Sequence, residues 1–236
     1  MDMMKKFFVL AFLAATMTAY AGELNDDDNS GGIELSKKNK EKDGDWHMHF
    51  AAGVNVVTGG PKGADFAPFR SWDLNWTIAQ YEYTPKGASQ TYSVGVGLGW
   101  RNYTLSDRDK AFGKVGDVTS IYAVDKVDGR TSRVHTMNVN IPVLFRQKIG
   151  GDFAVSVGAQ ININAYGRLV NKWDVDLDDD EYDVKTKKIG QRPLTVDVLG
   201  MVHFKDWALY CKYSPMDVFK KDRGLEFKSI AFGLYF

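Results

Sequence analysis

Two histidines separated by one residue are the first candidates for chemistry in this chain. His47 and His49 lie in the alternating stretch WHMHF, so an extended strand projects both imidazoles from the same face. Such a pair can supply two ligands to a metal ion, and Asp197 or His203 would have to complete the set. The competing interpretation, which we favour, places both rings in a polar hydrogen-bonding network. We therefore predict neither a metal site nor another cofactor.

A dense acidic segment, DVDLDDDEYD, spans residues 174–183. Its first residues follow the D-x-D-x-D spacing of a calcium-binding loop, but Asp179 stands at the sixth position, where such a loop requires glycine. We interpret the segment as a solvated loop. The alternative is a weak divalent-cation site that bridges to lipid phosphates.

Ser132 and His135 form a third candidate, a nucleophile with its general base. They lie three residues apart, where a polar connection meets an alternating stretch. This spacing does not by itself bring the hydroxyl within hydrogen-bond reach of the imidazole, and no third side chain is evident to orient the histidine. We predict that the chain is not an enzyme and keep cleavage or transfer of lipid acyl chains as the alternative.

The composition excludes several classes of protein. The 236 residues carry 30 basic and 30 acidic side chains, so there is no excess positive charge to attract nucleic acid. Cys211 is the single cysteine, so the chain forms no internal disulfide. Because it lies on the apolar face of an alternating stretch, we interpret it as a small hydrophobic side chain.

The first residues predict export from the cytoplasm. Lys5 and Lys6 precede an apolar run over residues 7–15, and the motif A-Y-A follows at residues 19–21. The run is too short for a membrane-spanning helix, which needs roughly 20 residues, so we predict a removed signal peptide over residues 1–21. Residues 22–45 are polar and charged, which predicts a disordered periplasmic segment.

From residue 46 onward, eight stretches alternate apolar and polar residues, as strands with one apolar face do. They span residues 46–57, 72–83, 90–100, 135–147, 152–167, 193–204, 207–213 and 229–236. Within 72–83 the apolar face switches, which predicts a bulge near Ala79. Long polar connections alternate with short ones. This pattern predicts an all-β fold over residues 46–236, an eight-stranded antiparallel transmembrane β-barrel in an up-and-down meander with short periplasmic turns.

Aromatic residues gather at the ends of these stretches. Every predicted strand carries one near its short-turn end: Trp46, Tyr83, Tyr92, Phe145, Phe153, Phe204, Trp207 and Phe236. The opposite ends carry Trp72, Trp76, Trp100, Tyr103 and Tyr166. Amphipathic rings are enriched at membrane–water interfaces, so the first set predicts a periplasmic aromatic belt.

The polar faces of the strands predict a filled lumen. They carry His47, His49, Arg101, Asn138, Asn140, Arg146, Gln160, Asn162, Asn164, Asp197, His203 and Lys212. This set is too polar for a soluble ligand pocket but suits a lumen of paired and hydrogen-bonded side chains. Eight strands leave an interior that side chains just fill, so we expect a plugged lumen and no open pore.

Three phrases carry a resemblance to a known family. VNIPVLFRQKI, LYCKYSPMDVFK and SIAFGLYF resemble the small outer-membrane β-barrel proteins of Bacteroides-type bacteria, the PorT-like outer-membrane β-barrel domain group. The resemblance covers roughly residues 46–236 and implies the fold and the outer membrane of a Gram-negative cell. It carries over no catalytic residue. A terminal aromatic on an alternating strand also resembles the signal read by the barrel-insertion machinery.

These observations predict an integral outer-membrane protein with a structural or interaction role in the cell envelope. Its partners would be outer-membrane lipid, the barrel-insertion machinery at the last strand, and a surface ligand or envelope protein at the extracellular loops, without nucleic acid. A lipid-modifying enzyme resembling a lipid A deacylase is the first alternative. A soluble periplasmic binder of the lipocalin type is the second, and it requires the apolar faces of the strands to point inward.

Overall fold

The computed structural model describes residues 44–61, 64–125, 130–175 and 180–236, with the side chains of 174–175 and 180–182 left aside. The predicted signal peptide, residues 1–21, and nearly all of the predicted polar segment, residues 22–45, lie outside the described residues. In the described part of the chain, the 3-10 turn η1 (Pro68–Arg70) is the only helical element. None of the described helices is long and apolar enough to cross a membrane.

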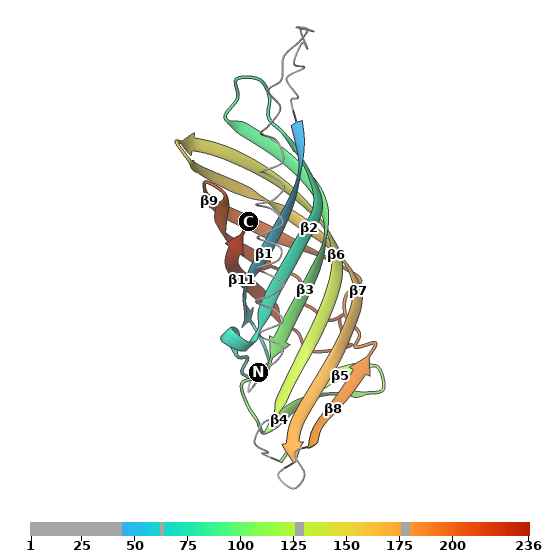
Figure 1. Ribbon diagram of the computed structural model, residues 1–236. Helices are drawn as coiled ribbons and strands as arrows, with labels where there is room; N and C mark the ends of the chain where they lie inside the picture. The colour runs from blue at the N-terminus through green and yellow to red at the C-terminus, as the bar shows by residue number, and fades with distance from the viewer. Residues whose placement is uncertain (1–43, 62–63, 126–129, 176–179) are drawn as a thin grey trace, which may run out of the picture. The chain divides into compact units, whose positions relative to one another are not determined.

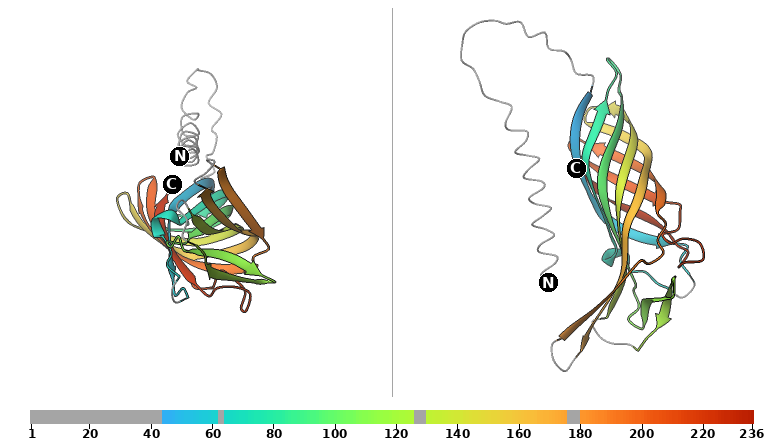
Figure 2. Two further views of the ribbon diagram at one scale, coloured as in Figure 1. Left: turned by 90° about the horizontal axis from the view of Figure 1, so that it is seen from below. Right: turned by 90° about the vertical axis from the view of Figure 1, so that its right-hand side faces the viewer.

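Eight strands form a closed antiparallel ring (Figures 1 and 2). In ring order they are β1 (Gly44–Thr58), β2 (Trp72–Tyr83), β3 (Gln90–Thr104), β6 (Thr131–Gly150), β7 (Phe153–Val175), β9 (Leu194–Phe204), β10 (Trp207–Ser214) and β11 (Lys228–Tyr235). Each strand pairs with the next along the chain, and β11 pairs with β1. The predicted all-β antiparallel meander of eight strands is therefore confirmed.

A bulge in β2 shifts its register against both neighbouring strands. The register between β2 and β3 shifts between Thr77 and Ala79, which confirms the bulge predicted near Ala79. A second shift lies between His47 and His49 in the pairing of β1 with β2. A bulge moves the following residues to the other face of the strand. Because of the shift, Asp73, Asn75 and Thr77 face inward before the bulge, and Gln80 faces inward after it.

The polar faces of the strands point into the ring and the apolar faces point out. The inner residues include Asn75, Asn138, Asn140, Gln160, Asn162, Asp197 and Lys212, all of which are buried. The outer residues include Val94, Val96, Val143, Val157, Ile161, Ile163, Leu194, Val198, Leu209, Phe232 and Leu234, each 38–54% exposed. A soluble ring would bury the second set. Here the apolar surface lies on the outside.

Glycines on the inner face of β3 make room for side chains of β6. A Cβ added at Gly99 would lie 2.5 Å from Oδ1 of Asn138, and one at Gly97 would lie 2.8 Å from Oδ1 of Asn140. Neither distance is compatible with a real side chain. The repeating G-x-G-x-G of β3 therefore lets two amides from the neighbouring strand fill the lumen.

Three strands that the sequence did not predict extend the structure at the end of the ring with long loops. β4 (Lys110–Val115) and β5 (Val118–Ala123) form a separate hairpin, and β8 (Asp180–Lys187) pairs with the end of β7 (Figure 2). The Phe112 amide N–H of β4 donates to the Ser132 hydroxyl of β6 at 2.8 Å, and Asn171 of β7 donates to the Phe112 carbonyl at 2.8 Å. The hairpin is thus tied to the ring.

Two apolar groups lie within this framework. The inner apolar layer, inside the ring, consists of Ala51, Leu144, Leu199, Met201, Ala208, Tyr210, Ala231 and Tyr235. The apolar cap, at the long-loop end, consists of Tyr103, Leu105, Phe112, Val134, Leu169, Ile189, Phe219 and Phe227. Tyr103 lies at the strand end where the sequence placed it, but it is 1% exposed and belongs to the apolar cap. It faces inward because β3 keeps its alternation beyond Arg101.

Candidate functional site

The middle of the ring holds the central cluster, two carboxylates and two cations from four strands. Asp73 of β2 accepts hydrogen bonds from Lys212 of β10 at 2.8 Å and from Nε of Arg101 at 3.1 Å. The guanidinium of Arg101, on β3, also pairs with Asp197 of β9. All four side chains are buried. Buried charges are tolerated when they are paired and hydrogen-bonded, and two positive charges here balance two negative charges.

Hydroxyl and amide groups complete the coordination of both carboxylates. The Tyr210 hydroxyl donates to Oδ2 of Asp73 at 2.9 Å. The Ser214 hydroxyl donates to Asp197 at 2.6 Å, and the Asn162 amide donates to the same carboxylate at 2.7 Å. The Asn75 amide also donates to Oδ2 of Asp73 at 2.8 Å, so each carboxylate has two donors besides its cations.

Side-chain amides continue the central cluster across the ring. Nε2 of Gln160 donates to Asn162 at 2.7 Å and lies 3.3 Å from Oδ1 of Asn75. Nδ2 of Asn140 lies 3.4 Å from the same oxygen. Asn164 donates to the Thr195 hydroxyl at 3.2 Å. These bonds connect β2, β6, β7 and β9 through the lumen.

A second polar cluster, the turn-end cluster, lies on the other side of the inner apolar layer. Glu82 of β2 accepts both terminal nitrogens of Arg146, at 3.2 and 3.3 Å, and the Gln80 amide at 2.8 Å. Nε2 of His49 lies 3.5 Å from Glu82, and its ring stacks on Tyr235 with centroids 4.8 Å apart. A bidentate arginine pair fixes the geometry of both side chains.

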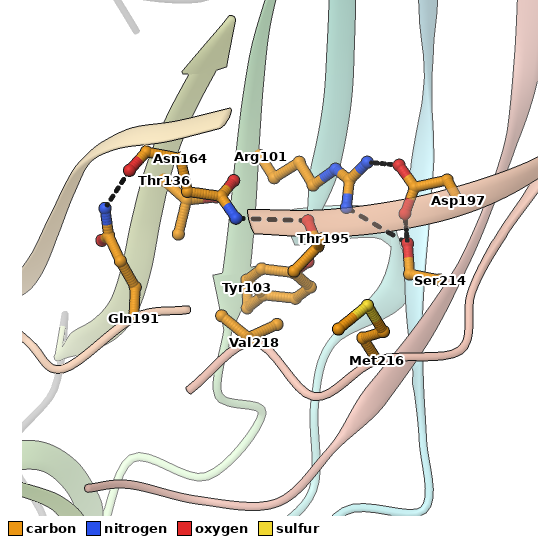
Figure 3. A pocket seen from close by; sticks show the side chains of 10 residues that line it. All are labelled: Arg101, Tyr103, Thr136, Asn164, Gln191, Thr195, Asp197, Ser214, Met216 and Val218. Carbon is orange, nitrogen blue, oxygen red and sulfur yellow. Dashed lines mark hydrogen bonds and ion pairs between the residues drawn. The ribbon is translucent and has the colours of Figure 1, made fainter. Parts of the chain in front are cut away.

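Two small cavities lie among the residues inside the ring. One cavity of about 20 Å³ is lined by Arg101, Asp197, Ser214 and their neighbours, whose side chains point toward one another in Figure 3. A second cavity of about 20 Å³ lies against the inner apolar layer and Lys212. Each volume accommodates about one water molecule. Neither cavity can bind an organic ligand.

Most of the residues predicted for the lumen lie together inside the ring. Arg101, Asn138, Asn140, Gln160, Asn162, Asp197 and Lys212 are buried there, with Asn164 half-buried beside them. His49, Arg146 and His203 belong to the turn end, separated from the others by the inner apolar layer. His47 pairs with Gln80 on the inner face but is exposed at the rim, its ring 6.0 Å from that of His49. It does not belong to the buried network.

Sequence reasoning missed the partners of these residues. Asp73 and Glu82, the acceptors of the two clusters, both lie on β2, whose alternation is broken by the bulge after Thr77. The signal was present in the polar positions of WDLNWTIAQYEY, once the change of face was allowed for. Tyr210 and Ser214 were missed because they look like ordinary strand residues.

The eight aromatics predicted for the short-turn end all lie on the outer face of that end. Tyr83 pairs with Tyr92, and Tyr92 with Phe145, whose rings are 5.5 Å apart. On the far side of the ring Phe204 lies 5.2 Å from Phe153 and 5.4 Å from Trp207. Trp46 and Phe236, both exposed, complete the set.

The geometry does not assemble the predicted serine–histidine pair. Ser132 is buried on the inner face of β6 and bonded to β4 and Asn171, whereas His135 lies on the outer face against Trp72. A different pair is within reach, because Oγ of Ser156 lies 2.7 Å from Nε2 of His203. Both are buried inside the ring, and neither lines the two cavities described above.

The geometry of the described residues does not support the other candidate sites. Within the described residues, no three His, Cys, Asp or Glu side chains are arranged to hold a metal ion. Asp197 is far along β9 from His203 and engaged by Arg101. The core of the acidic segment, residues 174–182, lies outside the described side chains. Cys211 is exposed on the outer face of β10.

Comparison with known proteins provides no family for this chain. No protein-family model matches it, and no curated protein shows significant similarity to its sequence.

Proposed function

We propose that this chain is an integral outer-membrane β-barrel protein that acts as a structural or interaction protein of the cell envelope. In this proposal, a signal peptide directs export of the chain and is then cleaved. The observation that carries the proposal is the orientation of the ring, with charged pairs inside and exposed valine, isoleucine and leucine outside. Lipid is the solvent in which that surface is stable. A closed ring leaves no unpaired strand edge in the bilayer.

The height of the apolar surface on the ring supports a location in a membrane. On β3 the outward residues run from Tyr92 to Trp100, eight residues or about 27 Å along the strand. At the strand tilt of about 40° found in such barrels, this spans roughly 20 Å, close to the apolar band of about 25 Å. The aromatic belt at the short-turn end then lies at the periplasmic interface.

The filled lumen supports a scaffold role and not a channel. The central cluster, the inner apolar layer and the turn-end cluster occupy the interior of the ring. The long-loop end carries the β4–β5 hairpin, β8 and the apolar cap, which give the extracellular surface a defined shape for partners. A surface ligand, an envelope protein and the barrel-insertion machinery, acting on β11, remain the proposed partners.

Heat-modifiable migration in gels tests the proposal. Protein extracted from the membrane fraction in detergent should migrate differently before and after boiling, since a closed, fully hydrogen-bonded ring resists unfolding by detergent. Recovery in the soluble periplasmic fraction, without a shift on boiling, would contradict the proposal. It would instead favour the soluble lipocalin-type binder, although the burial of polar residues inside the ring is the reverse of what that binder requires.

A further inference from the structure

The outer face of the sheet changes abruptly beyond the apolar surface at the long-loop end. Trp100, Met137 and Tyr166 are neighbours on β3, β6 and β7, and they form the last outward row of apolar side chains. Two residues further along β7, about 7 Å along the strand, stands Arg168. Its neighbours in the same row are His135 and, on β8, Lys187.

Basic residues fill this outer face over successive rows. Arg133 and Lys185 flank Val170, and Lys172 lies one row beyond with Asp183. Arg70 of η1 joins them, because its Nη2 donates to the Thr131 hydroxyl of β6 at 2.9 Å. The basic patch therefore consists of Arg70, Arg133, Arg168, Lys172, Lys185 and Lys187.

Two cations of the basic patch have no ion pair with the described residues. Asp183 is the carboxylate within it, and Lys185 binds it at 2.7 Å. A hydrogen bond from Lys185, with the charges of Lys185, Lys172 and Arg133, holds the pKa of Asp183 below its usual value. Arg168 and Lys187 form no ion pair with the described part of the chain. These two cations are therefore open to an external anion.

On the opposite rim of the ring, the exposed charges of the described residues are balanced. They are three lysines and three aspartates: Lys86, Lys148, Lys205, Asp45, Asp152 and Asp206. The asymmetry is therefore specific to the end with the long loops, and there to β6, β7, β8 and η1. Phe69, 93% exposed and adjacent to Arg70, adds an aromatic ring suited to the interfacial layer.

We propose that the basic patch binds the phosphorylated headgroups of glycolipid in the outer leaflet of the membrane. The inference rests on the proposed barrel, which places these side chains at headgroup depth beside the last apolar row. Guanidinium and ammonium groups are the phosphate-binding side chains of proteins, and arginine can bind phosphate in a bidentate manner. The sheet extension β6–β7–β8 serves as a flat platform on which the headgroups lie.

The test is a titration of the full chain, folded in neutral detergent, with bis-phosphorylated lipid A and with its dephosphorylated form. Native mass spectrometry measures the lipid bound. The double variant Arg168→Gln with Lys187→Gln should bind the phosphorylated form about 30-fold more weakly, since each basic residue contributes about fivefold. The matched control, Lys148→Gln with Lys205→Gln at the other rim, should stay within about twofold. Binding to the unaltered chain should weaken as salt is raised.

Equal binding of both lipid forms, or an equal loss in the control variant, would overturn the basic patch. Heat-modifiable migration is measured on every variant in parallel. Protein that shows the shift on boiling but ignores phosphate refutes the patch alone, whereas absence of the shift in the unaltered chain refutes the barrel and the patch together. If the double variant fails to fold, Lys187→Gln serves instead, because β8 lies outside the ring, and about a fivefold loss is expected.

Discussion

The central cluster and the basic patch use the same kinds of side chain on opposite faces of one sheet. In the central cluster, Arg101 and Lys212 meet Asp73 and Asp197, and every carboxylate has further donors. In the basic patch, Lys185 binds Asp183, whereas Arg168 and Lys187 form no ion pair with the described residues. The first arrangement is complete without a ligand and joins strands. The second leaves Arg168 and Lys187 available to an external anion. Charge balance thus distinguishes the group that supports the fold from the group proposed to bind.

The largest effect is expected inside the ring. Asp197→Asn leaves the buried Arg101 guanidinium without one of its two carboxylates, and breaking a buried pair costs about 3–5 kcal/mol. The free energy of unfolding in lipid vesicles, followed by urea titration and heat-modifiable gels, measures it. Asp152→Asn is the control, because Asp152 is exposed and lies 4.0 Å from Lys205. Its expected effect is within about 0.5 kcal/mol. Equal losses in both variants would remove the distinction between buried and exposed charge.

A charged residue placed on the apolar outer surface of the ring should destabilise the protein, in contrast to the charges of the basic patch. Val157→Arg places a guanidinium on the apolar surface of β7, and arginine at the bilayer midplane costs about 2–4 kcal/mol. Val184→Arg on β8 is the control, since Val184 is about as exposed but lies beyond the ring. The same unfolding measurement in vesicles compares the two. Similar stability of both variants would mean that the ring is not surrounded by lipid.

A smaller effect is expected from one hydroxyl of the central cluster. Tyr210→Phe removes the hydrogen bond to Asp73 and keeps the ring in the inner apolar layer. Hydrogen bonds to charged groups contribute about 1.5–3 kcal/mol. Tyr213→Phe, on the outer face of the same strand, should change the free energy of unfolding by less than about 0.5 kcal/mol. A larger loss for Tyr213→Phe would place the important hydroxyl outside the lumen.

The smallest effect on stability is expected in the basic patch itself. Arg168→Gln should change the free energy of unfolding by less than about 0.5 kcal/mol, because the side chain pairs with no carboxylate among the described residues. Its binding of phosphorylated lipid should nonetheless fall about fivefold. A stability loss as large as that of Asp197→Asn would show that the patch supports the fold and would erase its contrast with the central cluster.

Alternation alone was enough to predict the eight strands of the ring and their order. Period-2 patterning survives in these strands because each has one face toward the lumen and one away from it. The bulge at Thr77 was visible as a change of phase in β2. The consequence of the bulge for the two polar clusters was not predicted. The bulge made it impossible to assign from the sequence which residues of β2 face inward, so Asp73 and Glu82 were missed.

The structure at the long-loop end could not be predicted from the sequence. β4, β5 and β8 are short and polar, and they are held by bonds to β6 and β7 from distant parts of the chain, as between Phe112 and Ser132. Similarly, no local pattern indicates that Leu144 and Met201 form a layer between two polar clusters, since both are hydrophobic residues on otherwise polar faces. The basic patch depends on the register of three strands, which the sequence does not provide.

Closure of the ring has a kinetic consequence. The seam joins Ala51–Thr58 of β1 to Lys228–Tyr235 of β11, with Gly53 opposite Gly233. These partners are roughly 180 residues apart in sequence, a separation whose entropic cost makes late pairing and slow folding the rule. The seam is therefore the step on which assembly waits. Until the seam forms, the inner charges are exposed to water, and the edge strands β1 and β11 can pair wrongly. Transient binding by a chaperone would have its largest effect before the seam closes.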